Sequence, residues 1–158
     1  MRRNLLVICL LACAALLLSS STVLAADAWL GSWNLNVAKS KAVPGPLPKS
    51  QTLMFEATPT GIKLSSETVD AEGKTTQGTY EAKFDGTDVS WQGNPDADTA
   101  SPKRVNANSY INTWKMGGKV TIKAKVVVSA NGKTLTVTQT GTNSKGQAVK
   151  NRYVFDRQ

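Results

Sequence analysis

The side chains available for catalysis in this chain are carboxylates, lysines, tyrosines and hydroxyls. The sequence has no histidine, and its two cysteines, Cys9 and Cys13, lie in an apolar segment near the start. Acid–base catalysis would therefore rest on Asp, Glu, Lys or Tyr. The glutamates Glu56, Glu67 and Glu81 alternate with apolar residues, so we expect them to face water rather than to form a catalytic pair. We predict that the protein is not an enzyme and needs no cofactor.

The acidic segment Asp96-Ala97-Asp98 has the spacing of some calcium-binding loops. It lacks the downstream glycine and glutamate that complete such a loop, so no metal site is predicted. Instead, we expect Asn94, Asp96 and Asp98 to accept hydrogen bonds from their own backbone in a turn. The alternating threonines from Thr134 to Thr142 are typical of the solvent face of a strand.

The aromatic residues give the clearest indication of a binding site. Alternation places most of them on the apolar face of their segments, which would face the lumen of a closed barrel. Together with polar groups such as Gln139 and Asn151, these rings could surround one small molecule. A packed lumen without a ligand is the alternative. The predicted lining residues are Phe55, Tyr80, Phe84, Trp91, Trp114, Tyr153 and Phe155.

Regular turn signals divide the chain after its first 25 residues into short alternating segments. Turn formers followed by glycine recur throughout, and Asn131-Gly132 is the strongest hairpin signal. The segment Val120–Val126 has the cleanest alternation, and no segment after residue 25 keeps a helical apolar period for three turns. The sequence predicts an all-β fold, an antiparallel up-and-down β-barrel of about eight to ten strands. A two-sheet sandwich is the alternative, but its crossings need longer connections.

Two connections depart from this short-turn pattern. The segment Lys39–Ser50 contains Pro44, Pro46 and Pro48, which exclude a helix or an inner strand. We expect it to cross one end of the barrel as an extended strap. The second long irregular loop is Gly93–Asp98.

The first 25 residues have the features of a secretory signal peptide. Arg2 and Arg3 precede the apolar run Leu5–Leu18, which is too short to span a bilayer, and Val23–Ala25 has the small-x-small pattern of a cleavage site. We therefore predict a signal peptide over 1–25 and one domain over 26–158, exported to the periplasm or secreted. A lipobox that acylates Cys13 and a twin-arginine signal are the alternatives.

The net charge of +8 bears on the choice of partners. Cleavage after residue 25 would leave 17 basic against 11 acidic residues, a net charge of +6. Lysines on solvent-facing strand positions keep a barrel soluble and protect its edges. An anionic envelope polymer is the alternative partner. The cations are dispersed, so we expect no nucleic acid partner. We also expect no transmembrane span and a monomer.

Gly31-Ser32-Trp33, at the start of the first predicted strand, resembles the opening of the calycin barrels, which include the lipocalins, fatty-acid-binding proteins and avidins. The resemblance implies that Trp33 closes the narrow end of the barrel and stacks on a basic side chain from the last strand. The residues implied in this closure are Gly31, Trp33, Arg152 and Arg157.

The wider pattern from Gly31 to Ser50 resembles a group of small exported bacterial proteins that are lipocalin-like and uncharacterised. Two departures from the fatty-acid-binding proteins are clear. The segment Lys39–Ser50 cannot form their helical lid, and Tyr153-Val154-Phe155 lacks their Arg-x-Tyr pair.

We therefore expect an exported barrel that binds an apolar or amphipathic molecule in its lumen. The alternative is a non-enzymatic binder of macromolecules with a packed barrel, either an inhibitor of an exported hydrolase or a binder of anionic envelope polymer. In that case the strap would present Lys39, Lys41 and Lys49 to the partner.

Overall fold

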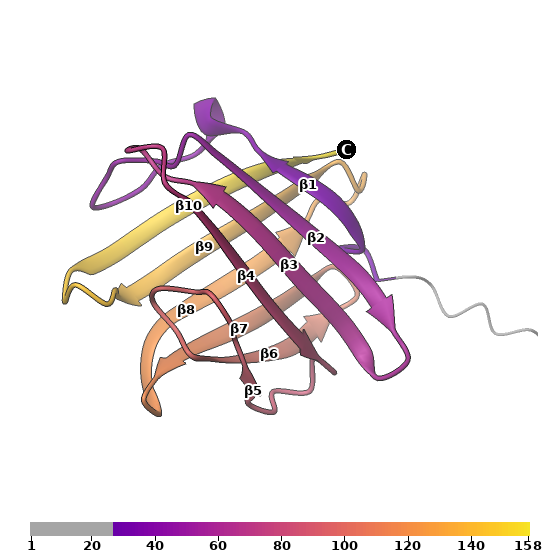
Figure 1. Ribbon diagram of the computed structural model, residues 1–158. Coiled ribbons are helices and arrows are strands. Elements are labelled where there is room, and N and C mark those ends of the chain that lie inside the picture. Colours follow the sequence, from indigo (N-terminus) through magenta and orange to yellow (C-terminus); the bar gives the residue numbers. More distant parts are fainter. Residues whose placement is uncertain (1–26) are drawn as a thin grey trace, which may run out of the picture.

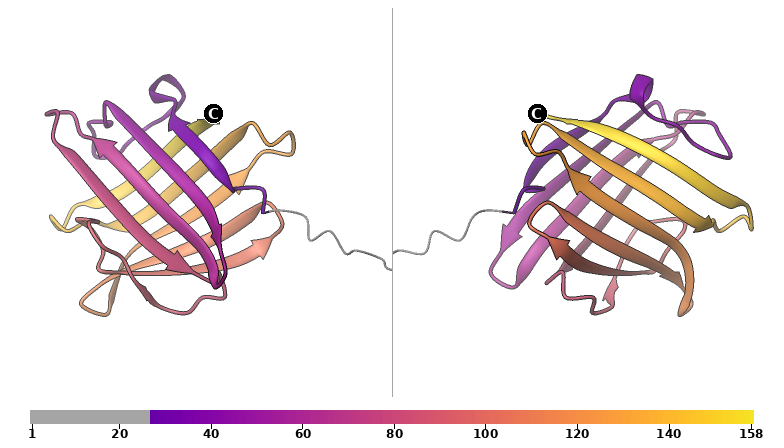
Figure 2. Two further views of the ribbon diagram at one scale, coloured as in Figure 1. Left: turned by 45° about the vertical axis from the view of Figure 1, so that its right-hand side comes forward. Right: turned by 180° about the vertical axis from the view of Figure 1, so that it is seen from behind.

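The computed structural model describes residues 27–158, which form one ten-stranded antiparallel sheet curled into a nearly closed barrel (Figures 1 and 2). The strand order is β4-β3-β2-β1-β10-β9-β8-β7-β6-β5, so neighbours along the chain pair and β1 joins the last strand. This confirms the predicted up-and-down, lipocalin-like barrel. The predicted signal peptide and both cysteines lie outside the described residues. Within the described part, no helix has the length and apolar character needed to cross a membrane.

The strands are short and separated mostly by tight turns, and one 3-10 turn, η1, follows β1. Their bounds are β1 Gly31–Leu35, η1 Val37–Lys39, β2 Ser50–Thr58, β3 Gly61–Val69, β4 Thr75–Ala82, β5 Val89–Ser90, β6 Thr99–Asn106, β7 Ser109–Met116, β8 Lys119–Val128, β9 Thr134–Thr142 and β10 Ala148–Arg157.

Two-residue alternation decides which side chains form the interior. In β8, Ala124 and Val126 are buried whereas Lys123 and Lys125 are exposed. A one-residue shift in register would exchange these two sets, so the buried apolar face fixes the pairing of the strand. The glutamates Glu56, Glu67 and Glu81 are exposed, as predicted.

The barrel closes at a narrow seam between β4 and the residues that follow β5. Thr79 and Gln92 exchange two backbone hydrogen bonds there, at 2.9 and 3.0 Å. Gly93 follows with φ +77°, and a Cβ at this position would lie 1.9 Å from the carbonyl oxygen of Gln77. Only glycine combines this backbone conformation with so close an approach, so Gly93 allows the two ends of the sheet to meet.

The proline-containing strap runs beside β10 before it reaches the end of the barrel. Because β1 ends at Leu35, much of the edge of β10 would otherwise lack backbone partners. Lys41 and Arg152 exchange two backbone hydrogen bonds of 2.8 Å, and the N–H of Lys150 donates to the carbonyl oxygen of Val43 at 2.7 Å. The strap therefore continues the sheet where β1 stops.

Trp33 is fully buried and held by the last strand. Arg157 lies opposite Trp33 in the pairing of β1 with β10, and its guanidinium stacks on the indole at 4.1 Å. The guanidinium also donates to the carbonyl oxygens of Ala28 and Leu30, at 2.5 and 2.7 Å. A Cβ at Gly31 would lie 3.0 Å from Arg157 Nη1, so this glycine leaves room for the guanidinium.

Arg152, the other predicted partner of Trp33, does not reach the indole. It occupies an outward position of β10, whereas Tyr153, Phe155 and Arg157 point inward. Its guanidinium donates to the carbonyl oxygen of Lys39 at 3.2 Å instead. Strand alternation therefore selects Arg157 over Arg152.

Trp29, for which the sequence pattern predicted no role, fills the same end of the barrel. Its ring stacks on Phe84 at 5.6 Å and contacts the edge of Tyr110 at 5.2 Å. The guanidinium of Arg104 lies 4.7 Å from the Trp29 ring and pairs with Asp27. Two tryptophans, each covered by an arginine, close this end.

Phe84, which was predicted to line the ligand cavity, is not among the residues that line it. Phe84 lies beyond the end of β4, at φ +60°. It packs against Trp29 and Tyr110 at the Trp29 end of the barrel and does not face the cavity. Alternation predicted that this side chain is buried. It could not predict which part of the interior the side chain occupies, because the chain turns just after Ala82.

Candidate functional site

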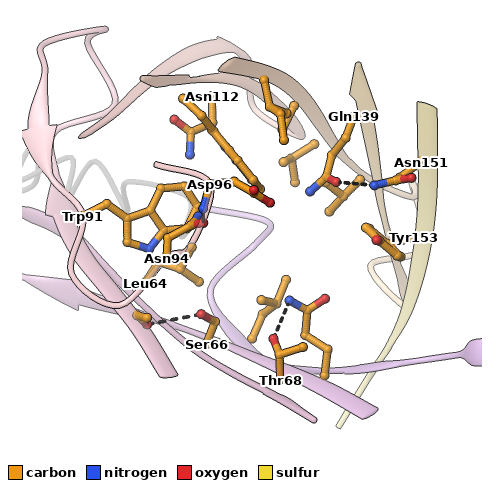
Figure 3. A pocket seen from close by; sticks show the side chains of 18 of the residues that line it. Leu64, Ser66, Thr68, Trp91, Asn94, Asp96, Asn112, Gln139, Asn151 and Tyr153 are labelled. Carbon is orange, nitrogen blue, oxygen red and sulfur yellow. Dashed lines mark hydrogen bonds between the residues drawn. The ribbon is translucent and has the colours of Figure 1, made fainter. Parts of the chain in front are cut away.

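The barrel contains a cavity of about 310 Å³ that is partly open to solvent (Figure 3). Pro44 of the strap is among its lining residues, and so are Phe55 and Tyr110 near Trp29. Side chains from β2, β3, β4, β7, β8, β9 and β10 line it, together with Trp91 and the loop that follows. Its volume lies at the low end of the range for ligand pockets, which suits one compact molecule.

Six of the seven predicted aromatic residues line this cavity, and Phe84 does not. Trp91 packs edge-on against Tyr80 and Trp114, with ring centroids 5.0 and 4.9 Å away. Their role in binding stays a prediction. The six residues are Phe55, Tyr80, Trp91, Trp114, Tyr153 and Phe155.

Polar side chains also face the cavity from inward strand positions. Asn151 Nδ2 donates to Gln139 Oε1 at 3.0 Å, and the Gln139 amide nitrogen points into the cavity (Figure 3). Asn112 Nδ2 donates to the hydroxyl of Tyr80 at 3.3 Å. Asn112 was missed in the sequence, although its place between Tyr110 and Trp114 at two-residue spacing is the signal that could have found it.

The three tyrosines remain protonated near neutral pH. Burial raises the pKa of Tyr80 and of Tyr110 above the ordinary range for a phenol. Burial also raises the pKa of Tyr153, and the negative charge of Asp96 adds to the effect. The tyrosine hydroxyls therefore offer hydrogen bonds to a ligand and do not act as bases.

The loop Gly93–Asp98 lies over the strap end of the cavity. The N–H of Asp96 donates to Asn94 Oδ1 at 2.8 Å, as predicted for a turn. Asp96 Oδ1 instead accepts from the backbone N–H and the hydroxyl of Ser144, both at 2.8 Å, and Asp98 Oδ2 accepts from the N–H of Gly117. The expectation of purely local bonds is wrong for these two carboxylates, because barrel closure brings neighbouring turns against the loop.

Two indole N–H groups of the cavity lack an acceptor among the described residues. They belong to Trp91 and Trp114, and both nitrogens are buried. An unpaired buried donor costs about 1–3 kcal/mol, so a ligand oxygen placed there would be stabilised.

Residues 27–158 contain no cluster of three or more Asp, Glu, His or Cys residues that could hold a metal ion. Asp96 is the sole carboxylate among the described residues that line the cavity. The site therefore provides apolar surface and hydrogen bonds.

The strand order and the internal cavity define a lipocalin-like, up-and-down β-barrel. No protein-family model and no curated protein matches the chain. Among solved structures, the chain is similar to zebrafish ileal bile acid-binding protein in complex with cholic acid, at 9% identity and a TM-score of 0.46. The match covers 83% of this chain and 99% of that chain. The fold assignment rests on the strand order and not on this likeness.

Proposed function

We propose that the protein is exported and binds one compact apolar or amphipathic molecule in the lumen of its barrel. The observation that supports this most is the 310 Å³ cavity lined by aromatic rings. Each Å² of apolar ligand surface buried there would contribute about 25 cal/mol. The polar groups of Asn112 and Gln139 would orient the ligand.

The cavity argues against the packed lumen of the alternative hypothesis. Protein interiors normally hold few voids larger than a water molecule. A volume of 310 Å³ corresponds to about ten water molecules in the liquid. Leaving that much space inside a small barrel sacrifices packing energy, which a bound ligand would restore.

A bulky side chain in the lumen tests this function. Ala124 is a buried lining residue of β8, and Ala124→Phe should remove most ligand binding by occupying the space. We expect native mass spectrometry of the protein from its own cells to show a chain beginning near Ala26 with a small molecule attached. The variant should carry none.

Ala148→Phe is the matched control, because Ala148 occupies an exposed position on β10 and the variant should keep the ligand. A bare polypeptide mass, together with tryptophan fluorescence that does not respond to a panel of lipids and aromatic compounds, would contradict the proposal.

A second candidate function is favoured by the charges outside the barrel. The outward residues Lys125 and Arg152 flank Thr138 in register, and Lys41 of the strap pairs with Arg152. Lys123 and Lys150 flank Thr140 in the next row. None of these cations belongs to a salt bridge within residues 27–158. This basic face is suited to an anionic polymer.

Charge reversal tests the second function. Combining Lys41→Glu, Lys125→Glu and Arg152→Glu should lower the salt concentration that elutes the protein from dextran sulfate resin. The control combines Lys63→Glu, Lys74→Glu and Lys83→Glu, which change the net charge equally at exposed positions elsewhere. Equal shifts for both variants would mean that net charge alone governs retention, and the basic face would then have no role.

A further inference from the structure

The charges of the cavity restrict the kind of ligand that it can hold. Asp96 is the only charged residue among the described residues that line it, and no lysine or arginine does. The nearby cations Lys150 and Arg152 occupy exposed outward positions of β10. A carboxylate or phosphate in the lumen would lose its hydration without gaining a counterion and would be repelled by Asp96.

The buried side-chain polar atoms of the cavity that lack a partner within the described residues are both donors. The indole N–H groups of Trp91 and Trp114 have no acceptor within the described residues, and Trp91 is more than nine-tenths buried. Gln139 Oε1 is occupied by Asn151, which leaves the Gln139 amide nitrogen directed at the lumen (Figure 3). The ligand that complements these groups carries oxygen acceptors.

Gly78 creates space beside one of these donors. A Cβ on Gly78 would lie 3.1 Å from Trp91 Nε1 and 3.1 Å from Ser66 Oγ. Gly78 is not among the glycines with positive φ in the described chain, so its backbone does not require glycine. The missing side chain instead leaves a niche, defined by Ser66, Gly78 and Trp91, in which a ligand oxygen can reach the indole N–H.

We infer that the natural ligand is an uncharged molecule whose carbonyl or ether oxygen accepts a hydrogen bond from Trp91 in this niche, and that carboxylates are excluded. The inference rests on the proposed function, because it concerns the same cavity. Asp96, with Oδ1 held by Ser144, places negative charge at the strap end and completes the selection against anions.

Two fluorescent probes that share a ring system test the inference. The ketone 6-propionyl-2-(dimethylamino)naphthalene is uncharged, and 6-(dimethylamino)-2-naphthoate replaces its ketone with a carboxylate. We expect the ketone to bind at least about tenfold more tightly at pH 7, because only the carboxylate must be desolvated as an anion. Asp96→Asn should bring the affinities of the two probes closer together, since the asparagine oxygen can still accept from Ser144 but carries no charge.

Variants of the niche test the hydrogen bond itself. Trp91→Phe removes the donor and keeps an aromatic ring, and it should weaken ketone binding by between about twofold and tenfold. Gly78→Ala fills the niche and should weaken the ketone similarly. Circular dichroism and a urea unfolding curve establish that each variant is folded before binding is measured.

The outcomes separate the inference from the function on which it rests. If both probes bind equally well and Ala124→Phe abolishes both, the lumen binds ligands but the selection by charge is wrong. If Trp91→Phe and Gly78→Ala leave ketone binding unchanged, the hydrogen bond in the niche is wrong. If neither probe binds, the inference fails. If the panel of lipids and aromatic compounds also gives no response, or if binding survives Ala124→Phe, the proposed function fails with it.

Discussion

Replacing Trp33 with alanine is expected to lower the free energy of unfolding by about 3–5 kcal/mol. The indole is fully buried, its Nε1 donates to the carbonyl oxygen of Trp29 at 2.8 Å, and Arg157 stacks on its face. The substitution would leave a large void in the core beside β1. It would also remove the hydrogen bond from Trp33 Nε1 to the carbonyl oxygen of Trp29. Chemical denaturation followed by far-ultraviolet circular dichroism measures the change.

Two further variants divide this effect between apolar packing and the stacked cation. Trp33→Phe retains an aromatic ring and should lower the free energy of unfolding by less than Trp33→Ala does. Arg157→Lys keeps the charge but loses the planar contact and the paired donors, and the stacking alone is worth about 0.5–2 kcal/mol. A loss below about 1 kcal/mol for Trp33→Ala would show that the indole does not close the barrel.

Replacing Gly93 with alanine is expected to lower the free energy of unfolding by about 2–5 kcal/mol. One part, about 1–2 kcal/mol, comes from placing a side chain at φ +77°. The rest comes from the contact of the new Cβ with the carbonyl oxygen of Gln77, which would lie at 1.9 Å unless β4 and β5 separate. Overpacking of this kind costs about 1–3 kcal/mol.

Gly146 provides a control with almost the same backbone conformation. Its φ is +75°, and a Cβ there would meet no atom within 4 Å. Gly146→Ala should therefore show only the conformational cost, and the difference between the two variants isolates the steric contact at the seam. If urea unfolding shows that Gly93→Ala and Gly146→Ala lower the free energy of unfolding equally, the close approach at the seam does not hold the barrel closed.

The seam also links stability to the cavity. Gly93 and Gly78 both line the lumen, and Gln92 O lies 3.4 Å from the ideal Cβ position of Gly78. Separation of β4 from β5 in Gly93→Ala would therefore widen the niche beside Trp91. The binding of the ketone probe to this variant should weaken even where the protein remains folded.

The pattern of residues along the chain determined the all-β barrel and most of its lining. Alternation is a local property of a strand, so Phe55, Tyr80, Tyr153 and Phe155 could be assigned to the interior without knowledge of their neighbours. The same rule distinguishes Arg157 from Arg152 once the bounds of β10 are known.

Only the tertiary structure decided how Trp29 fills one end of the barrel, what closes the side seam and how the cavity is charged. Trp29, Asp96 and Gly93 act through partners distant in sequence, Arg104, Ser144 and Gln77. Phe84 does not line the cavity because it lies beyond the end of β4, where alternation no longer determines which part of the interior a side chain reaches. Contacts between loops depend on the curvature of the whole sheet, and a two-residue period carries no information about that curvature.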